Sequence, residues 1–443
     1  MSLVSPLEQS FVTGVARLWA FAYLIVALFL RYTGQLVLFR MGPRRYVVTL
    51  LRLLRFLKVL RHNKVVKING GYKFQLYFPV FPSPAFDHAL KKFDPATTDP
   101  GPLSVVIGMT KACSYACPHC YQRHDVGGEL ELETLVGALR EMQQVGVALF
   151  NLEGGEPMLK LERLLHLVRA LGEKAEVWVN TTGDGVTLEK AKAMREAGVY
   201  GVFVSLHSPD RQECEAFFGK PGSFEVALQA MSTFRQVGIA VAINYCASVQ
   251  HAQTDGCERL FDLARDQGCA FVQLIHNKPA GSWIGEKEAL IREEALVEKL
   301  RRLHVDYNLL PRYAQHPSIS AHVFEEGPEV FGCTAGGIER FYLGHSGEVQ
   351  PCEFLNISFG NVKEERFTAI YRRMREHFRT ANEDWPCCAE AASLEAAFAQ
   401  MSLVKTPLPR EQTLELVKTW KPAVEPKLYR DLNLYPQSRE KSR

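Results

Sequence analysis

Residues 110–124 read TKACSYACPHCYQRH, and three cysteines stand in this stretch at the spacing Cys113-x3-Cys117-x2-Cys120. Thiolates are soft ligands, and at this spacing they can converge on one metal centre. Three thiolates on a cube of four irons leave one iron open, as a reactive centre requires. The alternative is a structural zinc site, closed by His124 as the fourth ligand. The stretch therefore predicts a metal site and leaves the identity of the metal open.

A second motif follows the next apolar run. Residues 151–158 read NLEGGEPM, which places Gly154, Gly155 and Glu156 at the end of a predicted strand. Two glycines allow a ligand to approach the backbone, and the carboxylate can accept charge-assisted hydrogen bonds from a cationic amine. A structural zinc site needs neither feature. The two motifs together therefore favour a reactive iron–sulfur centre.

Short β-rich runs alternate with helical patterns of ten or more residues along the central part of the chain. The predicted strands are 103–108, 147–152, 175–179, 201–205, 238–245 and 270–275. Parallel neighbours need crossovers of this length, so the repeat predicts an α/β fold with a parallel sheet. Ligands of such sheets gather beyond the carboxyl ends of the strands, which is where both motifs fall.

The composition is that of an ordinary globular protein, with 443 residues, of which 47% are apolar and 23% charged. Its eleven cysteines are too sparse for a disulfide scaffold, and their clustering is typical of metal ligands in a reducing compartment. The net charge of +3 hides an asymmetry, because residues 1–67 contain eleven Lys or Arg and a single acid, Glu8. We expect an anionic surface as the partner of this leader alone, and no nucleic acid.

The leader contains two apolar segments. Residues 11–30 are a borderline candidate for a bilayer span, about 20 residues long but interrupted by Arg17, and they lack the flanks of a cleavable signal peptide. Residues 46–64 place Arg52, Arg55, Lys58 and Arg61 three residues apart among Leu, Val and Phe, a pattern typical of a helix lying in a membrane interface. We expect a protein on the cytoplasmic side of a membrane, peripheral or held by a single anchor. The alternative is a cytoplasmic protein whose two helices pack against the enzyme body or a second subunit.

The two motifs resemble the hallmarks of the radical S-adenosylmethionine (SAM) superfamily, and the similarity extends over roughly residues 103–375. Residues 179–185 (VNTTGDG), 204–210 (VSLHSPD) and 217–228 (FFGKPGSFEVAL) are similar to later motifs of that family. The resemblance implies a partial (β/α)6, TIM-like barrel. It also implies a reaction in which SAM is reductively cleaved to a 5′-deoxyadenosyl radical that takes a hydrogen atom from a C–H bond. The electron would come from a donor such as ferredoxin or flavodoxin.

The resemblance also assigns roles to residues of this sequence. Cys113, Cys117 and Cys120 would hold a 4Fe–4S cluster whose open iron binds SAM, and His119 would lie near the adenine. Glu156, with Gly154 and Gly155, would receive the methionine amino group. Thr181 and Ser205 are candidates for polar contacts to the ribose or carboxylate, with strand-end capping as their ordinary alternative.

Residues 333–352, with the segment that follows them, resemble the SPASM or twitch auxiliary-cluster domains of the same superfamily. A full SPASM domain has seven cysteines for two clusters, whereas this segment offers Cys333, Cys352, Cys387 and Cys388. We therefore expect one auxiliary 4Fe–4S cluster, with its fourth ligand open, because adjacent residues on an extended chain point to opposite sides. The predicted organisation is a leader (1–63), a hairpin and linker (64–102), the barrel (103–310), the auxiliary domain (311–403) and a tail (404–443).

The substrate is not determined by these motifs. A membrane-associated leader favours a membrane lipid or isoprenoid chain as the substrate. Maturation of a peptide or protein is the second hypothesis. The third hypothesis is a non-catalytic iron–sulfur or zinc protein. The Gly-Gly-Glu motif argues against it, because such a protein needs neither an open iron nor a pocket for an amine.

Overall fold

The computed structural model describes residues 5–97, 100–286, 290–401 and 405–435. Its centre is a sheet of nine strands in the order β10-β9-β8-β7-β6-β5-β4-β11-β12. Six parallel strands lie within two residues of their predicted bounds: β4 (Ser104–Thr110), β5 (Leu149–Gly154), β6 (Glu176–Thr181), β7 (Val199–Ser205), β8 (Ala240–Ala247) and β9 (Phe271–His276). The predicted α/β class and parallel sheet are confirmed.

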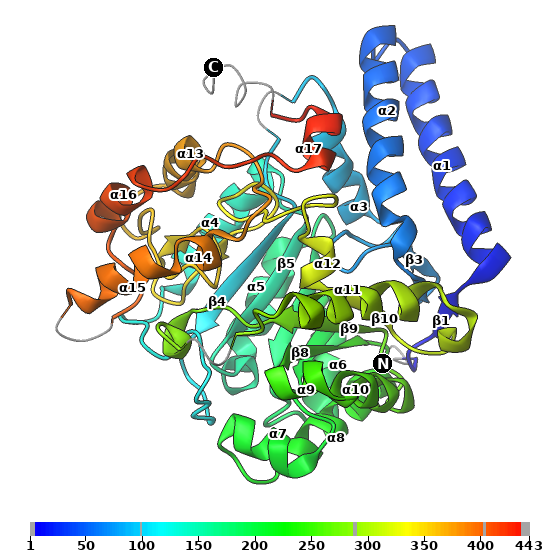
Figure 1. Cartoon of the computed structure of the whole chain (residues 1–443). Coiled ribbons are helices and arrows are strands. Elements are labelled where there is room, and N and C mark those ends of the chain that lie inside the picture. Colours follow the sequence, from blue (N-terminus) through cyan, green and yellow to red (C-terminus); the bar gives the residue numbers. More distant parts are fainter. Residues whose placement is uncertain (1–4, 98–99, 287–289, 402–404, 436–443) are drawn as a thin grey trace.

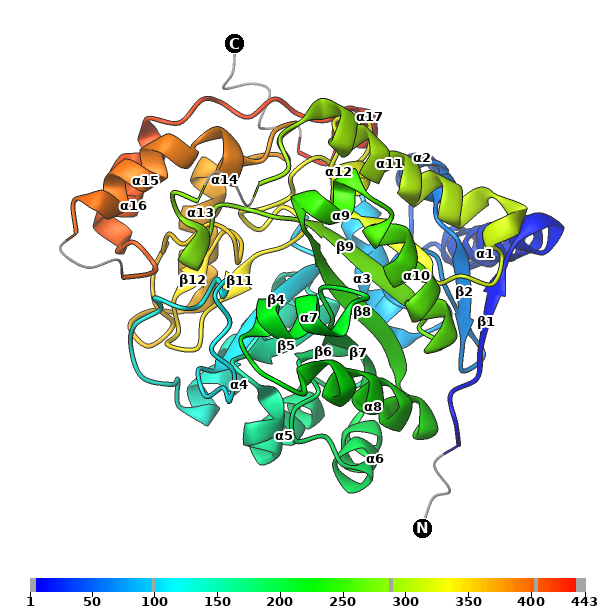
Figure 2. The ribbon, with the colours of Figure 1, turned by 60° about the horizontal axis from the view of Figure 1, so that its bottom comes forward.

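Helices cover the outer side of this curved sheet (Figure 2). They are α4 (Leu132–Val145), α5 (Leu161–Leu171), α6 (Leu188–Ala197), α7 (Arg211–Phe218), α8 (Ser223–Gln236), α9 (Val249–Gln253), α10 (Gly256–Asp266) and α11 (Glu294–Leu309). Their apolar faces and the outward-facing strand residues form the main hydrophobic core. Each crossover thus returns the chain to the amino end of the next parallel strand.

The sheet extends beyond the six predicted strands. A seventh parallel strand, β10 (Ser318–Ala321), pairs with β9, and the pair β11 (Tyr342–Leu343) and β12 (Val349–Gln350) adds to the other side through β4. These three strands come from the segment assigned to the auxiliary domain. The segment therefore continues the sheet before its own short helices begin, and the domain boundaries remain predictions.

An amino-terminal sheet covers the end of the barrel where the parallel strands begin. It consists of β1 (Gln9–Val12), β2 (Val65–Ile68) and β3 (Gly71–Lys73), and the last two form the predicted hairpin. Lys73 is buried and forms an ion pair with Glu176 at the start of β6, and Glu176 also accepts a hydrogen bond from the indole of Trp178. Val66 and Ile68 pack against residues at the amino ends of the strands. The hairpin therefore covers this end of the barrel.

The leader forms two long helices, α1 (Gly14–Val37) and α2 (Pro43–Val59), which stand beside each other at one edge of the molecule (Figure 1). One face of α2 packs on α1, on the linker helix α3 (Pro84–Ala89) and on the tail helix α17 (Lys427–Leu432). Arg52 is buried and donates to the carbonyls of Leu432 and Asn433. Arg55 donates to the carbonyl of Asp431. The prediction that Arg52 faces a membrane is therefore wrong, because it is buried against the carboxyl end of α17, whereas Arg55 stays exposed.

Apolar side chains nevertheless remain exposed along α1. Within the described residues, most of the exposed large apolar side chains belong to the two leader helices, among them Val15, Leu18, Trp19, Tyr23, Val26, Phe29, Leu30, Leu51 and Leu54. By length and composition α1 is able to cross a membrane, a test that amino-terminal signal segments and buried core helices also pass. Membrane association stays a prediction.

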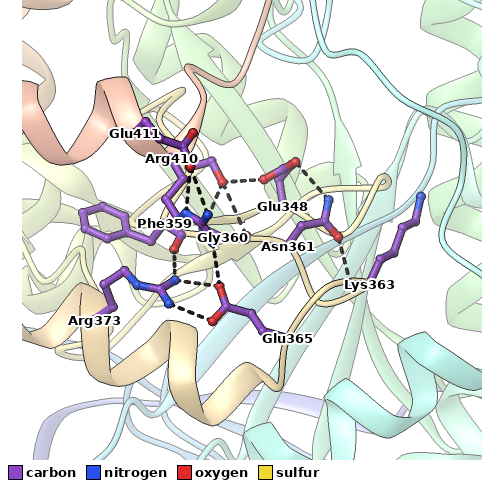
Figure 3. Close-up of polar contacts among 10 residues, drawn as sticks. Glu348, Phe359, Gly360, Asn361, Lys363, Glu365, Arg373, Arg410 and Glu411 are labelled. Carbon is purple, nitrogen blue, oxygen red and sulfur yellow. Dashed lines mark hydrogen bonds and ion pairs between the residues drawn. The ribbon is translucent and has the colours of Figure 1, made fainter.

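The carboxyl-terminal part adds α12 (His322–Glu325), α13 (Phe367–His377), α14 (Pro386–Ala389), α15 (Ala391–Ala399) and α16 (Arg410–Lys418). A polar network fastens the tail to this part (Figure 3). Arg373 donates two hydrogen bonds of 2.7 Å to Glu365, and Arg410 of α16 forms an ion pair with the same carboxylate. Asn361 donates to Glu348 at 2.9 Å. Residues 405–435 of the tail are therefore an integral part of the fold.

Candidate functional site

The cysteine loop leaves the carboxyl end of β4. Cys113 is exposed, whereas Cys117 and Cys120 are half-buried. The loop turns through a hydrogen bond of 3.2 Å from Cys120 N to Cys117 O, and Tyr115 N donates to Cys113 Sγ at 3.4 Å. Burial, together with the charges of Cys120 and Cys113, raises the pKa of Cys117 to about 12. Thiols that raise one another's pKa need a bound cation to become thiolates, which fits a metal cluster.

The glycines of the second motif hold this loop in place. Gly155 N donates to Thr110 O at 2.8 Å, and Glu156 N donates to Ala112 O at 2.7 Å. A Cβ on Gly154 would lie 2.2 Å from Thr110 O, and one on Gly155 would lie 2.1 Å from Ala112 O. We expected these glycines to admit a ligand. The close contact that the structure shows is with the backbone that enters the cysteine loop.

The side chain of Glu156 is fully buried, and four hydrogen bonds occupy its carboxylate. Oε1 accepts from Met158 N at 3.0 Å and from the Thr181 hydroxyl at 2.7 Å. Oε2 accepts from Thr182 N at 2.8 Å and from the Thr182 hydroxyl at 2.7 Å. A carboxylate has about four acceptor positions, so Glu156 is saturated by its own turn, through Met158 N, and by Thr181 and Thr182 at the end of β6. Its predicted contact with a methionine amino group stays a prediction.

A cavity of about 850 Å³, partly open to solvent, lies beyond the carboxyl ends of the strands. Five of the predicted cofactor-binding residues line it, namely His119, Gly154, Gly155, Thr181 and Ser205. Glu156 is not among its lining residues. The cavity therefore brings together residues that the sequence motifs place far apart along the chain.

The sequence analysis missed a polar layer in the same cavity. Glu153 is buried beside Asn180, whose Nδ2 donates to Glu153 Oε2 at 2.7 Å. Four acceptor atoms of the lining residues have no hydrogen-bond partner: Asn151 Oδ1, Glu153 Oε1, Asn180 Oδ1 and Asn244 Oδ1. Unpaired buried acceptors fit a ligand rich in ammonium, amino and hydroxyl groups, and SAM has all three. The alternation of polar and apolar residues along Asn151-Leu152-Glu153 was the signal that these side chains face inward.

An aromatic cluster flanks the cysteine loop. The ring of His119 lies 3.9 Å from that of Phe217 and 5.1 Å from that of His207, with Phe218 and Trp283 nearby. Burial lowers the pKa of His119 to about 4, and burial holds the pKa of His207 well below its usual range. Both rings are therefore neutral at physiological pH. A flat, uncharged pocket of this kind fits the predicted position of an adenine near His119.

The four carboxyl-terminal cysteines also lie largely out of solvent, since Cys333, Cys352 and Cys387 are buried and Cys388 is half-buried. Cys387 and Cys388 belong to one turn of α14, and their sulfurs lie 4.0 Å apart. A helical turn therefore supplies the bend that both thiols need to reach one cluster. Burial raises the pKa of Cys333 to about 11, so this thiol also needs a cation to ionise.

Among the described residues, no three His, Cys, Asp or Glu side chains lie close enough together to coordinate a single metal ion. This holds for both sets of cysteines. The assignment of the metal ligands therefore stays a prediction from the motifs.

Comparison with known proteins matches residues 107–264 to the radical SAM superfamily and residues 333–391 to an iron–sulfur cluster-binding domain, SPASM. An AdoMet-dependent heme synthase of Oleidesulfovibrio alaskensis is 27% identical over 300 residues, which cover 62% of this chain and 76% of that one. A PqqA peptide cyclase of Granulibacter bethesdensis is 24% identical over 318 residues, covering 66% and 80% of the two chains. The solved structure of Streptococcus suis SuiB bound to its precursor peptide SuiA has a TM-score of 0.51 at 18% identity, covering 67% of this chain and 72% of SuiB.

Proposed function

The chain belongs to the radical SAM superfamily and carries a SPASM iron–sulfur domain, and on that basis we propose that it abstracts a hydrogen atom from a C–H bond of an amphiphilic substrate. It is a radical SAM iron–sulfur enzyme whose cofactors are a 4Fe–4S cluster, SAM and an auxiliary iron–sulfur cluster. The cluster, when bound and reduced by a one-electron donor such as ferredoxin or flavodoxin, supplies the electron that converts SAM into a 5′-deoxyadenosyl radical.

The observation that carries this proposal is the contact between the cysteine loop and the barrel cavity. Gly154 and Gly155 join the two, so a cluster on the loop would stand at the rim of the cavity. The unpaired acceptors of Asn151, Asn180 and Asn244 would bind the donor groups of SAM. Neutral rings around His119 would exclude water from one side. Holding the reacting atoms close together in a dry site is the protein's main contribution to such chemistry.

The amphiphilic substrate is inferred from the leader. The exposed apolar side chains of α1 lie beside basic residues such as Arg40 and Arg44 at the tip of the helix pair. Apolar surface flanked by arginines is typical of a segment that binds an anionic membrane. A substrate that partitions into membranes, a lipid or an isoprenoid among them, would reach an enzyme held there.

A peptide substrate is the second candidate, and the PqqA peptide cyclase among the relatives favours it. The heme synthases among the relatives add synthesis of heme as a third. Incubating the reduced enzyme with a membrane lipid extract, a peptide library or a heme-precursor fraction separates the three. Only the correct class will increase 5′-deoxyadenosine formation and acquire a mass change.

The core of the proposal is tested without the substrate. The protein, purified without oxygen, should hold about eight irons per chain if it carries two cubanes. After reduction with dithionite it should release 5′-deoxyadenosine from SAM. Absence of this product from iron-replete enzyme would contradict the proposed reaction.

A further inference from the structure

A second cavity lies at the seam of the barrel, between β10 and the amino end of β4. Its free space, which includes the part open to solvent, is about 760 Å³. We name it the seam pocket. Much of its wall is apolar. The apolar residues come from the leader (Phe56), the linker (Phe78 and Phe93), the start of the barrel (Leu103), the auxiliary segment (Phe331) and the tail (Leu428, Leu432 and Leu434). Segments distant in sequence thus build one apolar space.

The far end of the seam pocket is polar. His322, which is 2% exposed, accepts a hydrogen bond at Nε2 from Gln273 Nε2 at 2.8 Å. The other ring nitrogen, Nδ1, must then carry the hydrogen, and it has no acceptor. Arg340 Nε is a second donor without an acceptor. These two donors are available to an acceptor on a bound molecule.

The charges around this end are balanced in pairs. Arg340 forms an ion pair with Glu326 at 2.8 Å, and Lys92 forms one with Glu339 at 3.1 Å. The remaining acid, Glu325, is hydrogen-bonded to Ser320 and Gln75. No lining cation is left to neutralise an anionic head group, and a cationic one would have to break an existing pair. The fitting head group is therefore neutral and accepts hydrogen bonds.

The polar end of the seam pocket adjoins the barrel cavity. Tyr77 lines both spaces, and Gln273, which bonds His322, lines the barrel cavity. A head group bonded to His322 Nδ1 would thus be separated from the cavity beside the cysteine loop by the hydrogen-bonded pair His322 and Gln273. The apolar end of the same molecule would lie against Phe56 and Leu432. These residues belong to α2 of the leader and to α17, two helices that pack against each other (Figure 1).

We propose that the seam pocket binds the substrate, a neutral amphiphile with a hydroxyl or carbonyl head group, and presents its head to the barrel cavity. The identification of the bound molecule as the substrate rests on the proposed function. The binding itself does not depend on it. The seam between the two edges of the parallel strands is the route by which an apolar molecule reaches the barrel from the leader.

The test uses the full-length, iron-replete enzyme and three probes that share one alkyl chain: decanol, decanoate and decylammonium. Isothermal titration calorimetry should show decanol binding at least tenfold more tightly than either charged probe. Leu432→Trp, which fills the pocket from α17, should abolish decanol binding. Leu51→Trp is the matched control, because Leu51 is 46% exposed on α2, the helix that packs on α17, and lies outside the pocket.

His322→Phe removes the unpaired donor and keeps a ring of similar size, so it should weaken decanol binding about tenfold. This variant decides alone if Leu432→Trp does not fold, as judged by circular dichroism and iron content. Equal affinity for the three probes, or equal decanol affinity in wild type and His322→Phe, would overturn the inference. Formation of 5′-deoxyadenosine by dithionite-reduced wild type, measured separately, tests the proposed function independently of these titrations.

Discussion

Replacing Glu156 by Gln separates two roles for this carboxylate. The resemblance to the radical SAM family implies that Glu156 binds the methionine amino group of SAM. In the structure its carboxylate accepts four hydrogen bonds from within the protein. Glutamine has the same shape but exchanges one acceptor oxygen for an amide nitrogen, which is a donor. The substitution therefore conflicts with whichever pair of donors faces that nitrogen.

The cost follows from the types of donor that face each oxygen. A threonine hydroxyl can rotate and accept a hydrogen bond from the new amide. A backbone N–H cannot, and either Met158 N or Thr182 N must lose its acceptor. One buried, unpaired N–H costs about 1–3 kcal/mol of unfolding free energy. Glu156→Ala leaves both N–H groups unpaired and should cost about 2–6 kcal/mol.

The assay is anaerobic urea unfolding followed by circular dichroism, together with calorimetric titration of SAM. Glu153→Gln is the matched control. The carboxylate of Glu153 accepts one hydrogen bond, from Asn180 Nδ2, so glutamine can keep an oxygen for Asn180 and leaves no backbone N–H without an acceptor. We expect less than about 1 kcal/mol of destabilisation for the control. If Glu156→Gln unfolds like wild type but binds SAM at least tenfold more weakly, Glu156 binds the amine and the reasoning from its hydrogen bonds is refuted.

Three further predictions address the loop, its surroundings and the leader. Replacing the three cysteines of the 110–124 loop by Ala should remove about half of the iron and abolish SAM cleavage; stoichiometric zinc without sulfide in wild type would contradict the cluster. Burial raises the pKa of Asp125 to about 6, against the opposing effect of the hydrogen bond from Thr406, so the neutral carboxyl stabilises the fold below about pH 4 and this stabilisation is lost as the pH rises through 6. Asp125→Asn should therefore lose about 2 kcal/mol less than wild type between pH 4 and pH 7 in urea unfolding, and parallel pH profiles would show otherwise. The full-length protein should sediment with anionic lipid vesicles, and Trp19→Glu on α1 should weaken this while Leu188→Glu, an exposed apolar position on α6, should not. Equal sedimentation of both variants would argue against binding through the leader.

The strands that the sequence predicted are those with a strong local signal. Runs such as 103–108 and 201–205 are apolar and rich in Val, and a Gly ends the helix before most of them. β10 (Ser318–Ala321) has small residues, two of them serines, and is buried on both faces. Nothing local distinguishes it from a loop, since its hydrogen bonds to β9 exist only in the folded sheet. Strand pairing of this kind is a tertiary property.

The candidate site shows the same division. The cysteine spacing and the Gly-Gly-Glu motif are local, and they identified the loop and most of the residues around the cavity. The saturation of Glu156 depends on Thr181 and Thr182, which follow the next strand, so its geometry was beyond the reach of the motif. The sequence pattern predicted that Arg52 faces a membrane. Periodicity cannot reveal that α17, from the other end of the chain, lies against it.

The two ends of the barrel differ in how their buried polar groups are satisfied, and this difference indicates where ligands bind. At the amino end, Glu176 accepts hydrogen bonds from Lys73, from Trp178 and from Val80 N, and the apolar hairpin covers them. Such a network stabilises a fold and needs no ligand. At the carboxyl end, four acceptors stay unpaired around one cavity. The carboxyl end therefore offers a group of acceptors that the donor groups of a bound molecule can pair with.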